Sequence, residues 1–175
     1  LLCRRQVLMC IRVWYGTHLC GILWAADIGM ARGAGLYVFK VLDYLGMGQT
    51  SDSIRALKYI KENCVRLNIK ILNFSVGYLP CSDKAERIKI LKLIDELWDM
   101  GVVVVAAAGN YGPAPFSVTV PGISRKIITV GSFDDIRSGK GPTDWCIVKP
   151  QILAPGHDII SLGTRVRTYG RITGT

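Results

Sequence analysis

An asparagine that directly follows a buried strand is the strongest candidate for chemistry in this sequence. Residues 102–108 form an uninterrupted apolar run, and Gly109 and Asn110 come straight after it. A glycine lets the backbone turn sharply at the end of the strand, and the asparagine amide then offers a fixed hydrogen-bond donor for an oxyanion. Taken alone, the pair also fits an Asx-type turn, which is the commoner role of such an asparagine.

A second candidate segment, Ser75-Val76-Gly77, ends another β-rich stretch, residues 69–76. In a parallel sheet the carboxyl ends of the strands meet at one edge, and ligands bind at that edge. We therefore expect Ser75-Val76-Gly77 and Gly109-Asn110 to lie side by side and to share one cleft.

The elements that must position these residues alternate between strand and helix. Apolar residues at helical spacing predict helices, and β-rich or continuous apolar runs predict strands. Such an alternation implies right-handed crossovers and an α/β fold, with a three-layer, mostly parallel sheet and helices on both faces. The expected strands are residues 36–42, 69–76, 102–108 and 126–132, and the expected helices are residues 51–67 and 83–100.

Composition narrows the classes of function. The 175 residues are 50% hydrophobic and 20% charged, which is typical of one globular domain. No apolar run approaches the roughly 18 residues that a membrane span requires, so no membrane partner is expected. The net charge is +9, but basic and acidic residues are interleaved and no nucleic-acid-binding motif accompanies them. We therefore expect no nucleic-acid partner.

The six cysteines show neither a Cys-x-x-Cys pair nor a regular framework. Cys20 and Cys64 have apolar helical neighbours, which favours reduced, buried thiols. This usage leans weakly towards a reducing compartment such as the cytoplasm. The spacing disfavours structural zinc, and we expect no cofactor.

A nucleotide-binding fold is an alternative from a different class. Gly46-Met47-Gly48 follows an expected strand and precedes an expected helix, as a dinucleotide fingerprint does. The third glycine of that fingerprint would fall at Ser51, and no acidic residue ends the next strand, at Asn73. Tight binding of NAD or ATP would be needed to support this alternative.

Six segments resemble signatures of the subtilisin-like serine peptidases, the subtilase family, and they follow one another in the same order as in that family. The first resembles G-T-H-x-x-G-I, and later ones resemble N-x-S-x-G, V-x-A-A-G-N, S-x-R-G-P-T and K-P-D-I-x-A-P-G. The segments are Gly16 to Ile22, Asn73 to Gly77, Val104 to Asn110, Ser138 to Thr143, Lys149 to Gly156 and, for the start of S-G-T-S-M-A, Thr173 to Thr175.

The resemblance implies an endopeptidase with a Ser-His-Asp triad and an oxyanion hole, acting on a peptide or protein substrate. On this basis the Asn110 side chain is the oxyanion donor. Two segments, Ser75 to Gly77 and Ala107 to Gly109, would form the walls of the cleft that holds the residue before the scissile bond. The segment Ser75 to Gly77 would also pair with an extended substrate as an added strand. These substrate-binding residues are Ser75, Val76, Gly77, Ala107, Ala108 and Gly109.

This sequence departs from the family at the triad. Tyr15 stands where the catalytic histidine precedes G-T-H, and a phenol, with a pKa of about 10, is no general base near neutrality. His18 lies one helical turn further on, so it should face a different environment. The catalytic aspartate would lie upstream of Leu1, and the nucleophile would follow Thr175.

These departures set the expected organisation and activity. Residues 1–14 match no family motif, and residues 15–175 are expected to form a partial peptidase domain. The stretch from Gly21 to Gly29 is short for the family's calcium loop, so no metal is expected. We expect a subtilisin-like serine endopeptidase by family, with this chain inactive. The alternative is a non-catalytic pseudoprotease that binds peptides.

Overall fold

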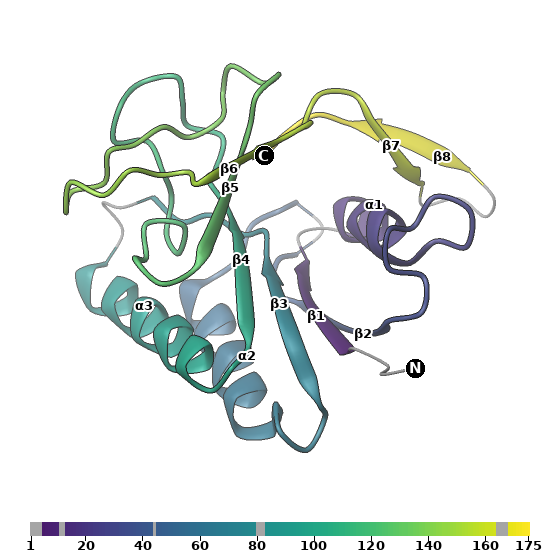
Figure 1. Ribbon diagram of the computed structural model, residues 1–175, viewed down its shortest axis with the longest axis horizontal. Helices are drawn as coiled ribbons and strands as arrows, with labels where there is room; N and C mark the ends of the chain where they lie inside the picture. The colour runs from purple at the N-terminus through teal and green to yellow at the C-terminus, as the bar shows by residue number, and fades with distance from the viewer. Residues whose placement is uncertain (1–4, 11–12, 44, 80–82, 164–167) are drawn as a thin grey trace.

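The computed structural model describes residues 5–10, 13–43, 45–79, 83–163 and 168–175, with side chains from Tyr15 onward. Within these residues, six parallel strands form a central sheet in the order β2-β1-β3-β4-β5-β6 (Figure 1). The strands are β1 (Arg5–Cys10), β2 (Gly35–Lys40), β3 (Ile69–Phe74), β4 (Val103–Ala107), β5 (Ile128–Ser132) and β6 (Ile152–Ala154).

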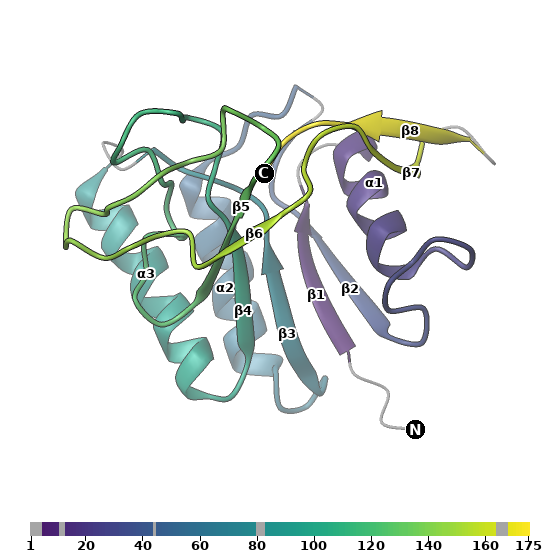
Figure 2. The same cartoon turned by 45° about the horizontal axis from the view of Figure 1, so that its top comes forward.

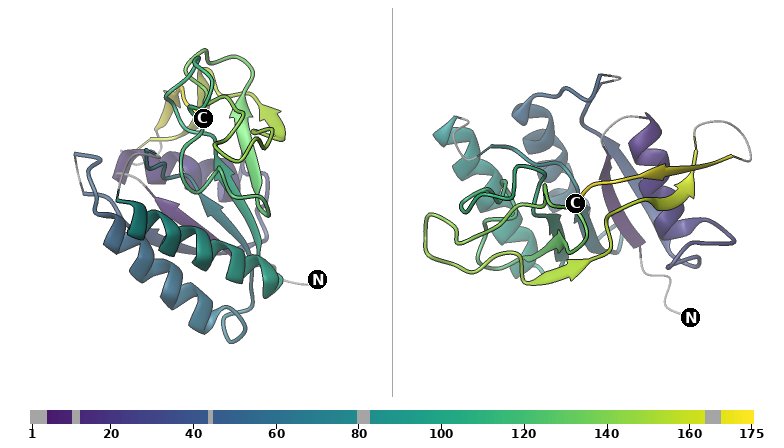
Figure 3. Two further views of the ribbon diagram at one scale, coloured as in Figure 1. Left: turned by 90° about the vertical axis from the view of Figure 1, so that its left-hand side faces the viewer. Right: turned by 90° about the horizontal axis from the view of Figure 1, so that it is seen from above.

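Two amphipathic helices, α2 (Thr50–Asn63) and α3 (Lys84–Asp99), pack side by side on one face of the sheet (Figure 3). Their fully buried residues share one core with the inward side chains of β3 and β4, which accounts for the alternating burial of those strands. The largest of these side chains are Leu57, Ile60, Leu72, Phe74, Ile90, Ile94, Leu97 and Val104.

The ends of α3 follow from its flanking residues. The Asp83 carboxylate accepts a hydrogen bond from the backbone N–H of Ala85 at 2.8 Å and so caps the first turn. Gly101, with a φ of +84°, turns the chain out of the helix and into β4. This tight turn sets where β4 begins, and therefore where Gly109 and Asn110 emerge.

The opposite face carries α1 (Val13–Trp24), which packs against a separate two-stranded antiparallel sheet (Figure 2). That sheet consists of β7 (Ile159–Leu162) and β8 (Tyr169–Ile172). Gly21 of α1 lies so close to β7 that a Cβ there would be 2.2 Å from the Ser161 hydroxyl oxygen. Helices on both faces of a parallel sheet confirm the expected three-layer α/β fold.

The structure adds two features that the sequence did not predict. Residues 5–10, to which no element was assigned, form β1 in the middle of the sheet. The region after Ser132, to which no helix or strand was assigned, contains β6 and the β7–β8 pair. Of the cysteines described, Cys64 is buried as expected, Cys20 is only half-buried and Cys146 is exposed.

None of the helices described is long and apolar enough to cross a bilayer.

Candidate active site

The two expected wall segments extend from neighbouring strands. Strands β3 and β4 pair in parallel, with Phe74 opposite Ala106. The chain therefore leaves both strands at the same edge of the sheet, and Ser75-Val76-Gly77 emerges beside Ala107-Ala108-Gly109. The prediction that these segments are adjacent is confirmed. Whether they bind a substrate stays a prediction.

A tight turn after β4 presents Asn110. Gly109 has a φ of +91°, a conformation that favours glycine. Two backbone hydrogen bonds connect this turn to the loop containing residues 137–139. The Gly139 N–H donates to the Gly109 carbonyl at 2.8 Å, and the Gly112 N–H donates to the Arg137 carbonyl at 2.7 Å. Backbone hydrogen bonds on both sides thus fix the position from which the Asn110 side chain projects.

The Asn110 side chain is exposed and has a distant partner. Its Oδ1 accepts a hydrogen bond from the backbone N–H of Thr175 at 2.9 Å, across 65 positions of sequence. Because a backbone N–H can only donate, the amide oxygen faces Thr175 and the nitrogen faces away. Among the described residues Nδ2 has no acceptor, so this N–H₂ group remains available as a donor.

A series of hydrogen bonds brings Thr175 to this position. The Gly174 N–H donates to the Gly156 carbonyl at 2.9 Å, and the Gly156 N–H donates to the Asp134 carboxylate at 2.7 Å. The Ser132 hydroxyl donates to the same carboxylate oxygen at 2.6 Å. Hydrogen bonds from Ser132 and then from the Gly156 backbone lower the pKa of Asp134. The segment before Thr175 is thereby tied to the carboxyl end of β5.

A cavity of about 350 Å³ lies between α1, β8 and the face of the sheet opposite α2 and α3. Tyr15 of α1 lines it together with Ser75, Ala107 and Thr175. Tyr15, which occupies the position of the expected catalytic histidine, thus faces the same cavity as both wall segments and Thr175. Within the residues described, Tyr15, Ser75, Ala107 and Thr175 line one cavity, and whether this cavity is a catalytic site stays a prediction.

His18 is committed to the packing of α1 against β7. It is 2% exposed, and its Nε2 lies 2.8 Å from the Ile159 carbonyl, which can only accept a hydrogen bond. The Ser161 hydroxyl donates to the His18 carbonyl at 2.7 Å. With Nε2 acting as a donor to the backbone, His18 is poorly placed to take a proton from a nucleophile. The other histidine, His157, is exposed in the loop before β7.

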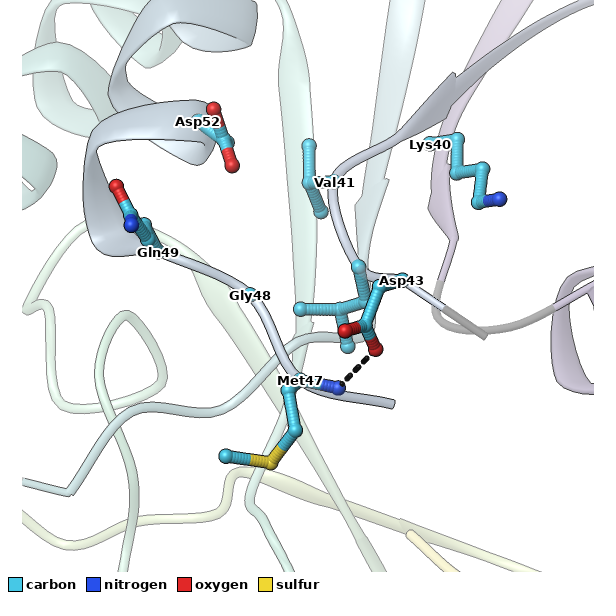
Figure 4. A pocket seen from close by; sticks show the side chains of 8 residues that line it. Lys40, Val41, Asp43, Met47, Gly48, Gln49 and Asp52 are labelled. Carbon is cyan, nitrogen blue, oxygen red and sulfur yellow. Dashed lines mark hydrogen bonds between the residues drawn. The ribbon is translucent and has the colours of Figure 1, made fainter. Parts of the chain in front are cut away.

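The glycine-rich loop after β2 lines a cavity of about 650 Å³ (Figure 4). The Asp43 carboxylate accepts hydrogen bonds from the N–H groups of Leu45 and Met47, both at 2.9 Å. A phosphate group would need those N–H groups and would be repelled by the carboxylate. Asp52 lines the same cavity. The loop geometry therefore disfavours the nucleotide alternative.

No group of three or more His, Cys, Asp and Glu side chains could hold a metal ion in the part of the chain that the structure describes.

Two residues that contact the wall segments or follow them directly were assigned no role from the sequence. Tyr78 follows the first wall, its hydroxyl lies 2.6 Å from that of Ser53 on α2, and burial raises its pKa. Thr119 is fully buried between the walls. Thr119 lies in the loop before β5, and nothing in its local sequence indicates that it contacts two segments distant in the chain.

Comparison with known proteins gives the family. The model of the subtilase family matches residues 13–175. The chain is also 34% identical to serine protease AprX of Bacillus subtilis (strain 168), in a match that covers 85% of this chain and 39% of AprX. The chain therefore belongs to the subtilase family.

Solved structures agree with this assignment. The S41 psychrophilic protease superposes with a TM-score of 0.75 at 27% identity and covers 93% of this chain and 58% of its own. Sphericase gives a TM-score of 0.77 at 25% identity and covers 94% of this chain and 59% of its own. The chain thus spans less than two thirds of each of these three relatives.

Proposed function

We propose that this chain carries the peptide-binding and oxyanion-binding parts of a subtilisin-like serine endopeptidase site, and that it binds peptides without hydrolysing them. The observation that carries the proposal is the orientation of Asn110. Its amide oxygen is held by the Thr175 N–H, so its N–H₂ end is a donor directed away from Thr175, at the edge where the two walls emerge.

The substrate is an extended peptide. In the proposed complex its backbone runs along Ser75-Val76-Gly77 as an added strand, and the residue before the scissile bond lies between this segment and Ala107-Ala108-Gly109. The carbonyl of that residue accepts a hydrogen bond from Asn110 Nδ2. A preorganised donor of this kind stabilises the negative charge that develops on the oxygen during acyl transfer.

The lack of turnover follows from Tyr15. A serine nucleophile needs a neighbouring base to take its proton, and neither the Tyr15 phenol nor His18, which is bonded to Ile159, can fill that role at neutral pH. Tyr15 is also the observation that favours the second candidate function, a pseudoprotease, for which binding a peptide without cleaving it would be the biological role.

Activity-based labelling tests the absence of turnover. We expect the 175-residue chain to show no labelling by a fluorophosphonate probe and no cleavage of a fluorogenic peptide library between pH 6 and 9, while AprX, treated in parallel, serves as the positive control. Inhibitor-sensitive cleavage by the unmodified chain would contradict the proposed roles, and His18 would then be the first residue to replace. Labelling of the complete natural protein would favour the endopeptidase over the pseudoprotease.

A further inference from the structure

One carboxylate oxygen beyond the end of β5 accepts three hydrogen bonds. Asp134 Oδ1 accepts from the hydroxyl of Ser132, the last residue of β5, at 2.6 Å. The same oxygen accepts from the backbone N–H groups of Gly156 at 2.7 Å and His157 at 3.1 Å. Gly156 and His157 belong to the loop between β6 and β7. Because Ser132 is buried in the sheet, Asp134 fixes this loop to the carboxyl end of β5.

The loop that Asp134 holds is bonded in turn to the segment that orients Asn110. The Gly174 N–H donates to the Gly156 carbonyl at 2.9 Å, and the next N–H, that of Thr175, donates to Asn110 Oδ1 at 2.9 Å. A Cβ built on Gly156 would lie 2.4 Å from the Gly174 carbonyl oxygen, so these two backbone segments are in contact. A Cβ built on Gly174 would lie 3.5 Å from Asn110 Nδ2. A displacement of Gly156 therefore reaches the Asn110 amide through one hydrogen-bonded segment.

The turn that carries Asn110 is anchored separately from Asp134. The Ser132 N–H donates to the Ser138 hydroxyl at 2.8 Å, and the Gly139 N–H donates to the Gly109 carbonyl at 2.8 Å. These bonds hold the backbone before Asn110 without the Asp134 carboxylate. Loss of that carboxylate should therefore change the orientation of the Asn110 amide and leave the position of its backbone in place.

We propose that Asp134 is a positioning residue, which keeps the Thr175 N–H against Asn110 Oδ1 and so keeps Asn110 Nδ2 directed towards the ligand. This inference rests on the proposed function, because it takes Nδ2 to donate to a bound peptide. Without the Thr175 contact the amide can turn over and present its oxygen, which only accepts hydrogen bonds and repels an oxygen atom of the ligand. Asp134 acts through Asn110 and not on the ligand itself.

The expected size of the effect follows from the fraction of molecules whose amide has the competent orientation. The apparent affinity falls in proportion to that fraction. A single hydrogen bond of ordinary strength changes such an equilibrium by about two- to twelvefold. We therefore expect loss of the Asp134 carboxylate to weaken peptide binding by about three- to tenfold.

Binding measurements in two backgrounds test the proposal on the 175-residue chain. The ligand is an N-acetylated tetrapeptide that ends in alanine with a free carboxylate, whose oxygen can accept from Asn110 Nδ2. Isothermal titration calorimetry gives dissociation constants for the unmodified chain, Asp134→Ala, Asn110→Ala and the double variant. We expect Asp134→Ala to weaken binding about three- to tenfold in the unmodified background and to have almost no effect once Asn110 is alanine. A merely structural role would weaken binding equally in both backgrounds.

Nuclear magnetic resonance reports the orientation of the amide without any ligand. In the chain labelled with nitrogen-15, Asp134→Ala should shift the Thr175 backbone signal and the Asn110 side-chain N–H₂ signals. Asp134→Asn keeps an oxygen acceptor without the charge, so its effects on signals and binding should be intermediate. Asp144→Ala is the matched control, because Asp144 is also exposed and pairs only at the surface, with Arg87 at 3.1 Å. It should change neither the binding nor these signals.

The outcomes separate this inference from the proposed function. Asp134 is exposed, so its truncation leaves no cavity, and if circular dichroism shows that Asp134→Ala does not fold, Asp134→Asn carries the test. Equal losses of affinity in both backgrounds, or unchanged Thr175 and Asn110 signals in the folded variant, would overturn the positioning role while peptide binding stands. If no peptide bound to the unmodified chain at millimolar concentration, the proposed function would fail, and the signals without ligand would still decide whether Asp134 positions the amide.

Discussion

The two ends of the Asn110 amide have different roles at the residue scale. The oxygen accepts from the Thr175 N–H, which orients the group, and the nitrogen is left to donate. A donor for an oxyanion has to be held rigidly before the charge develops, since reorientation during the reaction would reduce its effect. The turn at Gly109 and the contact with Thr175 provide that rigidity from opposite sides.

Replacing Asn110 by Asp tests the donor separately from the positioning. The aspartate can still accept from Thr175, but it presents a negative charge where Nδ2 was. We expect Asn110→Asp to weaken binding of carboxylate-terminated peptides by well over tenfold, and Asn110→Ala by roughly tenfold, as is typical for the loss of a hydrogen bond to a charged group. Titration calorimetry measures both. Equal binding by all three proteins would show that the amide does not contact the ligand.

A substitution at Gly109 tests its backbone conformation and its contact with Thr119. At a φ of +91° a side chain is strained, and its Cβ would overlap Thr119 Cγ2. We expect Gly109→Ala to lower the free energy of unfolding by about 2–4 kcal/mol. Gly33→Ala is the matched control, because a Cβ there meets nothing within 4 Å, and its effect should stay within about 0.5 kcal/mol. Urea denaturation compares the two. Similar losses in both variants would contradict the close contact.

At the scale of elements, local sequence patterns predicted the helices α2 and α3 and the strands β2 to β5, but not β1, which lies in the middle of the same sheet. The expected helix at residues 83–100 agrees with α3 to within a residue at each end, because Asp83 and Gly101 mark its ends in the sequence itself. The β7–β8 pair was missed, because its stability comes from contacts with α1 at His18 and Gly21, far away in the sequence. Local sequence carries no signal for such contacts.

Lys149 joins β5 to the loop that leads into β6. Its ammonium group is buried and donates to the Ile127 carbonyl at 2.9 Å and to the Thr129 hydroxyl at 3.1 Å. Burial lowers the pKa of Lys149 from 10.5 to about 8. The folded chain therefore releases this proton at a lower pH than the unfolded chain does, and between about pH 8 and 10.5 stability should rise with pH.

The Lys149→Met variant isolates this contribution. The difference in the free energy of unfolding between the unmodified chain and the variant should shift by about 2 kcal/mol in favour of the unmodified chain from pH 7 to 9.5. Urea denaturation at several pH values measures it. A difference that stays constant over this range would show that Lys149 keeps an ordinary pKa in the folded chain.

At the scale of the whole molecule, the sequence predicted which segments meet but not what lies between them. The apolar run before Gly109 and the strand before Ser75 indicated two neighbouring strand ends, and parallel pairing of β3 with β4 brings them together. The position of the Thr119 side chain between the walls and the position of β1 in the sheet both depend on tertiary packing. No periodicity or local motif in a single sequence encodes these contacts.

Mapping a bound peptide by nuclear magnetic resonance tests the central claim most directly. The 175-residue chain, labelled with nitrogen-15, is titrated with an N-acetylated tetrapeptide ending in alanine, and the backbone and side-chain amide signals are followed. We expect the largest shifts at Ser75 to Gly77 and Ala107 to Asn110, including the Asn110 side-chain N–H₂ signals, with no cleavage of the peptide. The absence of shifts at these residues, or shifts confined to another site such as the loop of Gly46 to Gly48, would contradict the account.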